Sequence, residues 1–235
     1  MRPSVARAAL TLLEQAGCQV AVPRAQTCCG QPGYNSGDYR GAIAIAKQVI
    51  SNFENYDYVV LPSGSCAGMM VRHYPALLAG EWQGRAEAFA QKVYELTSFL
   101  DEVCAYRPPA MTELGAITYH DACAGLRELE IRDQPRRLLV AAGAEVRELS
   151  QRDVCCGFGG TFCARMPAIS AKMADDKLAD IESSGADLVL AGDLGCLLAL
   201  AGRASRCEKP VEFRHVAEAL AGQLDTPSIA APDAG

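Results

Sequence analysis

At 235 residues, the chain is long enough for one large domain or two small ones with real cores. Half of it is apolar and 21% is charged, which excludes a disordered chain, and a net charge of −6 without a long basic run argues against nucleic acid as a main partner. No apolar run reaches the roughly 18 residues of a spanning helix, and the N-terminus has an amphipathic helix pattern and no signal-peptide pattern. We therefore expect a soluble, cytoplasmic protein without direct membrane insertion, which would reach a membrane only through its partners.

Helix and strand patterns alternate along the chain. In the first half we predict a helix over residues 4–16, a strand near Val20, a helix over 39–53 and a strand over 58–61. A helix-rich connector over residues 85–103 ends at Arg107-Pro108-Pro109. In the second half we predict, in order, a strand over 116–120, a helix over 134–142, a strand over 145–149, a helix over 168–184 and a strand over 187–190. Such alternation is typical of α/β units with parallel sheets.

An internal repeat relates the two halves. Thr27-Cys28-Cys29-Gly30 matches Val154-Cys155-Cys156-Gly157, and the ten residues that end at Cys66 match the ten that end at Cys196. A third block, Ala16-Gly17, matches Ala142-Gly143 in the same order. We therefore predict an α/β fold of two pseudo-symmetric repeats: a first repeat over 1–84, a helical connector over 85–114, a second repeat over 115–224 and a disordered tail over 225–235.

Cysteines follow the predicted strands in both halves. Cys66, Cys123 and Cys196 each come directly after a strand, and each Cys-Cys-Gly motif follows a strand by a few residues. Because ligands in open α/β sheets lie outside the carboxyl ends of the strands, we expect these cysteines to converge. Eleven cysteines in a cytoplasmic chain favour metal or redox chemistry over structural disulfides.

The second half offers a complete set of four thiolates, Cys123, Cys155, Cys156 and Cys196. Four thiolates hold either zinc or an iron–sulfur cluster. Adjacent cysteines reach one small ion poorly, whereas a larger cluster accepts both from a turn that Gly157 makes possible. We favour an iron–sulfur cluster, with zinc and a dithiol/disulfide role as alternatives.

The first half contains Cys28, Cys29 and Cys66 but no counterpart of Cys123. The spacing of the second half places that counterpart three or four positions before Met1, and the strand that would carry it is also missing. Either the true start lies upstream or this half has lost its cluster, and the presence of all three other cysteines favours the first explanation.

Other polar and sulfur-bearing residues have weaker signals. His120 and Asp121 precede Cys123 at a strand end. They serve either as hydrogen-bonding groups or proton carriers beside the cluster, or as partners of loop backbone groups. Cys163 could approach the cluster, but we favour a packed thiol. Structural or surface roles are predicted for Cys18, Cys104, Cys207, His73 and His215. A solvated helix face is predicted for Lys172, Asp175, Asp176, Lys177 and Asp180. No substrate pocket or catalytic base is indicated.

The repeated cysteine motifs of the chain resemble those of the CCG-domain family. This family includes the cysteine-rich subunit of heterodisulfide reductase and the iron–sulfur subunits of glycolate and glycerol-3-phosphate oxidoreductases. The segments that carry the resemblance are Thr27-Cys28-Cys29-Gly30-Gln31-Pro32, Pro62-Ser63-Gly64-Ser65-Cys66, Cys155-Cys156-Gly157-Phe158-Gly159-Gly160-Thr161-Phe162 and Gly195-Cys196-Leu197-Leu198. The resemblance implies an electron-transfer subunit with a [4Fe–4S] cluster in the second repeat, and another in the first if its fourth ligand exists.

The resemblance also implies two partner subunits, one a ferredoxin-type iron–sulfur protein, in a complex that oxidises L-lactate to pyruvate and passes electrons towards the respiratory chain. One departure is that Cys66 and Cys196 each lack the second cysteine of the CxxC pair with which the broader family ends its motif. This favours ordinary four-thiolate ligation or a cluster with an open iron. Alternatives are a heterodisulfide-reductase-like thiol/disulfide subunit, a glycolate oxidase iron–sulfur subunit and a zinc-stabilised interaction module.

Overall fold

The computed structural model of the chain describes residues 2–111 and 114–231. The elements of its N-terminal part are α1 (Pro3–Gln15), α2 (Gln31–Ser36), α3 (Tyr39–Phe53), β1 (Val59–Leu61), α4 (Gly64–Gly68), η1 (Met69–His73), α5 (Tyr74–Leu77), α6 (Glu81–Ala90), β2 (Val93–Glu95), α7 (Leu96–Ser98) and η2 (Phe99–Val103). The elements that follow are β3 (Ala116–Tyr119), α8 (Cys123–Glu128), α9 (Gln134–Ala141), β4 (Glu145–Val146), α10 (Phe162–Arg165), α11 (Pro167–Ser184), β5 (Leu188–Ala191), α12 (Leu194–Arg206), β6 (Glu212–His215) and α13 (Val216–Leu220).

The strands form two parallel sheets, one in each half. β1 pairs with β2 in a two-stranded sheet, and the second sheet has the order β4-β3-β5-β6. The register pairs Leu61 with Glu95 in the first sheet and Ala191 with His215 in the second. The pair β1–β2 thus corresponds to the pair β5–β6, and the predicted α/β fold with parallel sheets and two repeats is confirmed.

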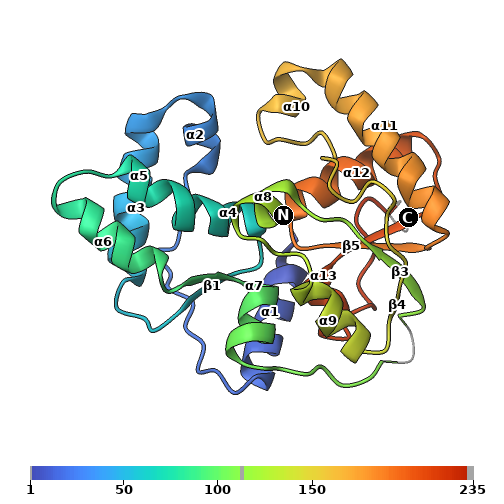
Figure 1. The fold of residues 1–235 in the computed structure, drawn as a ribbon, viewed down its shortest axis with the longest axis horizontal. Coiled ribbons are helices and arrows are strands. Elements are labelled where there is room, and N and C mark those ends of the chain that lie inside the picture. The colour runs from blue at the N-terminus through green and yellow to red at the C-terminus, as the bar shows by residue number, and fades with distance from the viewer. Residues whose placement is uncertain (1, 112–113, 232–235) are drawn as a thin grey trace.

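The two halves meet where α4 and α8 pack together. Figure 1 shows α2, α3, α5 and α6 grouped on one side and α10, α11 and α12 on the other, with α4 and α8 between them. A Cβ atom on Gly64 would lie 2.9 Å from the Cα of Gly125, so the backbones approach too closely for a larger residue. Two glycines therefore set the distance between the halves at this contact.

The N-terminal helix belongs to the core of the second half. The apolar face of α1 contributes Ala8 and Leu12 to a buried cluster that also contains Ile117, Leu138 and Val216. α1 packs chiefly against α13, the last helix of the fold. The two repeats therefore share one hydrophobic core, in addition to separate cores around α3–α6 and around α11–α12.

The structure corrects several predicted elements. The predicted strand near Val20 is wrong, because residues 18–23 pair with no strand and the described part of the first half has no counterpart of β3 beside which they could lie. β4 ends at Val146, earlier than predicted, although the N–H of Arg147 still donates to the Ile117 carbonyl at 2.8 Å. The strands β2 and β6 were not predicted, and β2 lies within the segment predicted as a helical connector.

Part of the segment predicted as a disordered tail is packed on the fold. Ile229 is buried, its N–H donates to the Phe213 carbonyl at 2.9 Å, and Arg214 donates to the Thr226 carbonyl at 2.6 Å. The buried side chain of Ile229 and these hydrogen bonds hold residues 226–229 against β6. Residues 232–235 of the predicted tail lie outside the described residues. Within residues 2–111 and 114–231, none of the helices combines the length and apolar character required to span a bilayer.

A buried carboxyl group, Glu95, ends β2 and caps α7. Its Oε2 accepts from the N–H of Thr97 at 2.8 Å, from the Thr97 hydroxyl at 2.6 Å and from the N–H of Ser98 at 3.2 Å. Its Oε1 has no hydrogen-bond partner among the described residues, and burial raises the pKa of Glu95 to about 7. The carboxyl group is therefore readily protonated in the folded protein.

Replacing Glu95 with glutamine is expected to remove a pH dependence of stability. Because the folded-state pKa lies above the ordinary value of 4.5, the folded state holds the proton longer, and stability falls as pH rises between these values. Glutamine keeps the acceptor for α7 and carries no charge. Urea unfolding followed by circular dichroism should show wild type losing roughly 2 to 3 kcal/mol more than Glu95→Gln between about pH 5 and pH 8. Parallel pH profiles for the two proteins would contradict this account.

Candidate metal centre

The structure brings together the four predicted thiols of the second half, here called the second cysteine set. Cys123 begins α8, Cys155 and Cys156 lie in the loop between β4 and α10, and Cys196 lies in the first turn of α12. The sulfurs of Cys156 and Cys196 lie within 4.8 Å of each other. Along the order Cys123, Cys155, Cys156, Cys196, each thiol shifts the pKa of the next one, so the four thiols are neighbours. Convergence at the carboxyl ends of β3 and β5 accounts for this arrangement.

The charges of the second cysteine set are unfavourable without a positive partner. Contact with Cys123 lowers the pKa of Cys155, and contact with Cys156 lowers the pKa of Cys196 to about 7. The other two thiols, Cys123 and Cys156, have raised pKa values, first because of the same neighbouring sulfurs and then because of burial. Four adjacent thiolates would repel one another, and a metal ion or an iron–sulfur core is the kind of partner that allows all four to ionise.

A tight turn lets two adjacent cysteines face the same place. Gly157 has a φ of +84°, and its N–H donates to the sulfur of Cys155 at 3.4 Å. The hydroxyl of Ser170, on α11, donates to the Gly157 carbonyl at 2.9 Å and fixes the turn against that helix. The left-handed backbone at Gly157 is thus the local reason why the Cys-Cys-Gly sequence can present both sulfurs.

Two charged residues predicted on a solvated helix face instead hold the loop that leads to the motif. Lys177 is 1% exposed and donates to the Gln151 carbonyl at 2.5 Å. Asp180 is also buried and accepts from the N–H groups of Ser150 and Gln151, both at 3.0 Å. The prediction is wrong for these two residues because their partners are loop backbone groups, which a helical charge pattern does not reveal.

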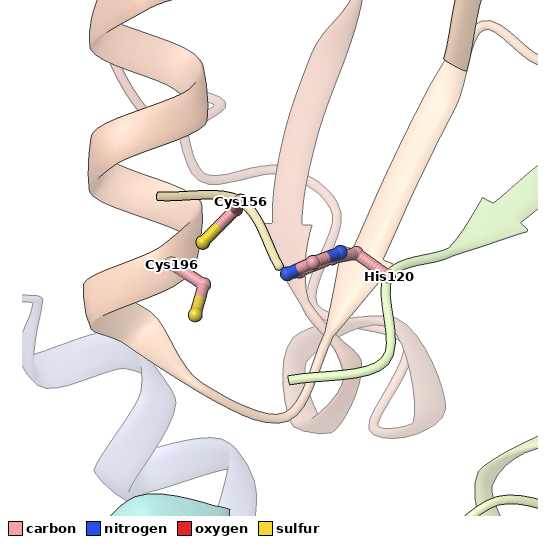
Figure 2. Close-up of side chains that lie close together, drawn as sticks. All are labelled: His120, Cys156 and Cys196. Carbon is pink, nitrogen blue, oxygen red and sulfur yellow. The ribbon is translucent and has the colours of Figure 1, made fainter. Parts of the chain in front are cut away.

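The end of β3 places His120 and Asp121 beside the second cysteine set. Asp121 accepts two hydrogen bonds from Arg136, at 2.9 and 2.8 Å, and Arg136 also donates to Glu148 at 2.6 Å. The hydrogen bond from Arg136 is the main reason why the pKa of Glu148 is lowered. Figure 2 shows that His120 points instead towards Cys156 and Cys196, and one ring nitrogen lies within 4.8 Å of both sulfurs. Of the two residues, only His120 faces the thiols.

The three thiols of the first half, the first cysteine set, are also brought close together. The sulfurs of Cys29 and Cys66 are 3.4 Å apart, and contact with Cys29 lowers the pKa of Cys66 to about 7. Cys28 is exposed, while the buried hydroxyl of Tyr74 donates to the Cys29 carbonyl at 2.8 Å. Burial and then the charges of all three cysteines raise the pKa of Tyr74, so Cys28 lies in the same neighbourhood. The described residues show no fourth cysteine in this set.

Asp193 links the two sets. It caps α12 through the N–H of Gly195 at 3.2 Å, and its other oxygen accepts from the N–H of Ser65 at 3.1 Å. The N-termini of α4 and α12, which carry Cys66 and Cys196, therefore face each other across one buried carboxylate.

A cavity of about 330 Å³ opens between the halves at this point. Cys123, Cys155 and Cys196 line one wall, and Gln31 and Asn35 from α2 line the opposite one. Nothing in the sequence indicated this cavity, because its walls come from segments far apart in the chain. The second cysteine set thus faces an open space of the size of a small-molecule site.

The other cysteines lie in separate places. The sulfurs of Cys18 and Cys104 are 3.9 Å apart, beside the core that α1 shares with the second half. Cys163 donates to the Gly160 carbonyl at 3.1 Å, and Cys207 is exposed at the end of α12. None of these four contacts either cysteine set among the described residues.

Comparison with known proteins agrees with the repeat. The family described as "CCG: Cysteine-rich domain" matches residues 1–71 and 117–201. The chain is 45% identical to lactate utilization protein A of Geobacillus kaustophilus (strain HTA426), over 92% of this chain and 91% of that protein. It is 41% identical to the protein of the same name in Bacillus pumilus (strain SAFR-032), over 94% of this chain and 93% of the relative.

Proposed function

The chain belongs to the CCG cysteine-rich domain family, and on that premise we propose that it is an iron–sulfur electron-transfer subunit in the oxidation of L-lactate to pyruvate. The observation that carries the proposal is the convergence of four thiols, from Cys123 to Cys196, at the carboxyl ends of β3 and β5, where three of them line one cavity and Cys156 lies within 4.8 Å of Cys196. Its relatives are named for lactate utilization, which supports the choice of pathway.

The second cysteine set would hold a [4Fe–4S] cluster. When bound, such a cluster accepts and donates single electrons. The chain's own residues would supply four sulfur ligands, shape the Cys155-Cys156-Gly157 turn around them and shield Cys156 and Cys196, both of which are buried. We assign the carbon chemistry to other subunits of the complex. A second cluster in the first cysteine set requires a ligand that the described residues do not provide.

The proposed partners are two further subunits, one of them a ferredoxin-type iron–sulfur protein, in a cytoplasmic complex attached to the membrane only through such partners. The test is to isolate the complex from its own cells through an affinity tag on this chain, under anaerobic conditions. L-lactate should bleach the absorbance near 400 nm, and glycolate should not. Bleaching by glycolate alone would instead identify a glycolate-oxidising subunit, and no response to either would overturn the assignment to 2-hydroxy acids.

One observation favours a second candidate, a thiol/disulfide redox subunit. The cavity between the halves reaches three sulfurs of the second cysteine set, so a small disulfide could approach the group bound there. Reduction of a disulfide substrate by the isolated, reconstituted chain would support this candidate over an electron-transfer role alone.

A further inference from the structure

The ring of His120 is buried without a hydrogen-bond partner. The residue is 0% exposed, and neither Nδ1 nor Nε2 bonds to any atom of the described residues. Leaving a polar group buried and unpaired destabilises the folded state, because the group has lost its hydrogen bonds to water. A native fold that tolerates this cost usually supplies a partner, which for His120 is to be sought among the atoms that its ring faces.

The surrounding structure fixes the direction in which the ring points. The backbone N–H of His120 donates to the Leu190 carbonyl at 2.8 Å, which extends the β3–β5 pairing through this residue. The next residue, Asp121, is held by two hydrogen bonds from Arg136. Because the backbone is held on both sides of His120, the ring points towards the sulfurs of Cys156 and Cys196, as Figure 2 shows.

The sulfur of Cys196 is the natural acceptor. This sulfur lies within 4.8 Å of a His120 ring nitrogen and stands at the end of the line of four sulfurs, whereas Cys156 lies between two others. A neutral imidazole carries one N–H group, so donation to a thiolate sulfur needs no protonation of the ring. The alternative role considered from the sequence, satisfying loop backbone, is not seen in the described residues.

We propose that His120 is a positioning residue of the second cysteine set, whose ring N–H donates a hydrogen bond to the sulfur of Cys196. The inference rests on the proposed function, because its effect is exerted on the cluster that Cys196 would bind. Reduction adds negative charge to a cluster, and an N–H group directed at a ligand sulfur stabilises that charge. His120 therefore raises the midpoint potential of the centre.

The test compares wild type with His120→Phe, which keeps a flat ring without a donor, and His120→Gln, which keeps an N–H group. All three are reconstituted anaerobically and titrated redox-potentiometrically with EPR detection, and iron and sulfide are quantified in each. We expect equal iron and sulfide, a lower midpoint potential in the phenylalanine variant and a return towards wild type in the glutamine variant. An unchanged potential in a fully loaded phenylalanine variant overturns the proposal.

A second measurement covers the case in which the phenylalanine variant does not fold or load. Pulsed EPR of wild type labelled with ¹⁵N-histidine should show weak nitrogen coupling at the reduced centre. Absence of coupling, or the strong coupling of a direct iron–nitrogen bond, overturns the hydrogen bond. If wild type binds no iron, the proposed function fails, and Co²⁺ bound at the same cysteines is used: its sulfur-to-metal absorption should shift in His120→Phe, and an unshifted spectrum overturns the inference.

Discussion

Replacement of Cys156 by alanine is expected to leave the second half unable to hold its cluster. Cys156 is 1% exposed and stands between Cys155 and Cys196, so its loss breaks the line of four sulfurs at its centre. Three thiolates that remain would hold the group far more weakly, and bound iron should fall by the full content of one cluster. Iron and sulfide quantification after anaerobic reconstitution gives the answer.

The matched control is Cys207→Ala. Cys207 is exposed at the end of α12 and contacts neither cysteine set among the described residues. The Cys207→Ala variant should keep the wild-type iron content. This result would distinguish the loss of a specific ligand from a general effect of removing one thiol. Equal iron content in wild type and Cys156→Ala would show that the second cysteine set is not the binding site.

Replacement of Gly157 by alanine should disturb both the fold and the metal centre. At a φ of +84° an alanine is strained, and its Cβ would lie 2.7 Å from the Ser170 carbonyl oxygen and 2.8 Å from the Cβ of Met173. Strained backbone and overpacking each cost on the order of 1 to 3 kcal/mol, so we expect a loss of roughly 3 kcal/mol together with a poorly loaded centre. Urea unfolding and iron content measure the two effects.

Gly160 provides the control for this substitution. It also has a positive φ, +61°, but an added Cβ would meet no atom within 4 Å. Gly160→Ala should therefore show only the backbone cost of about 1 kcal/mol. If both alanine variants lose the same stability, the close contact with Ser170 and Met173 is not what fixes the turn.

Much of the fold could be predicted from the repeat. Comparing the halves aligned Cys66 with Cys196 and placed both after buried strands, which the structure confirms with β1 and β5. The strands β2 and β6 escaped prediction because they contain charged residues, Glu95 in β2 and Glu212 and Arg214 in β6, and so lack the continuous apolar run that marks β1 and β5. The strand predicted near Val20 shows the opposite error: a β-rich pattern forms no strand when no neighbouring strand is present.

The candidate site was predictable in its sulfur atoms but not in its surroundings. Spacing identified the second cysteine set because strand ends bring distant cysteines to one edge of a sheet. The burial of Lys177 and Asp180 could not be predicted, since their partners are backbone groups of the loop 150–151. His120 and Asp121 are neighbours with equal signals in the sequence, and only the position of Arg136 on α9 separates a structural carboxylate from an imidazole that faces the thiols.

The most direct test of the central claim is anaerobic quantification of iron and acid-labile sulfide, with EPR of the reduced protein. We predict a brown protein that absorbs near 400 nm, contains iron and sulfide in equal amounts and shows the EPR signal of a reduced [4Fe–4S] cluster that depends on Cys123, Cys155, Cys156 and Cys196. A colourless protein that contains zinc and no sulfide would contradict it and identify the second cysteine set as a structural zinc site.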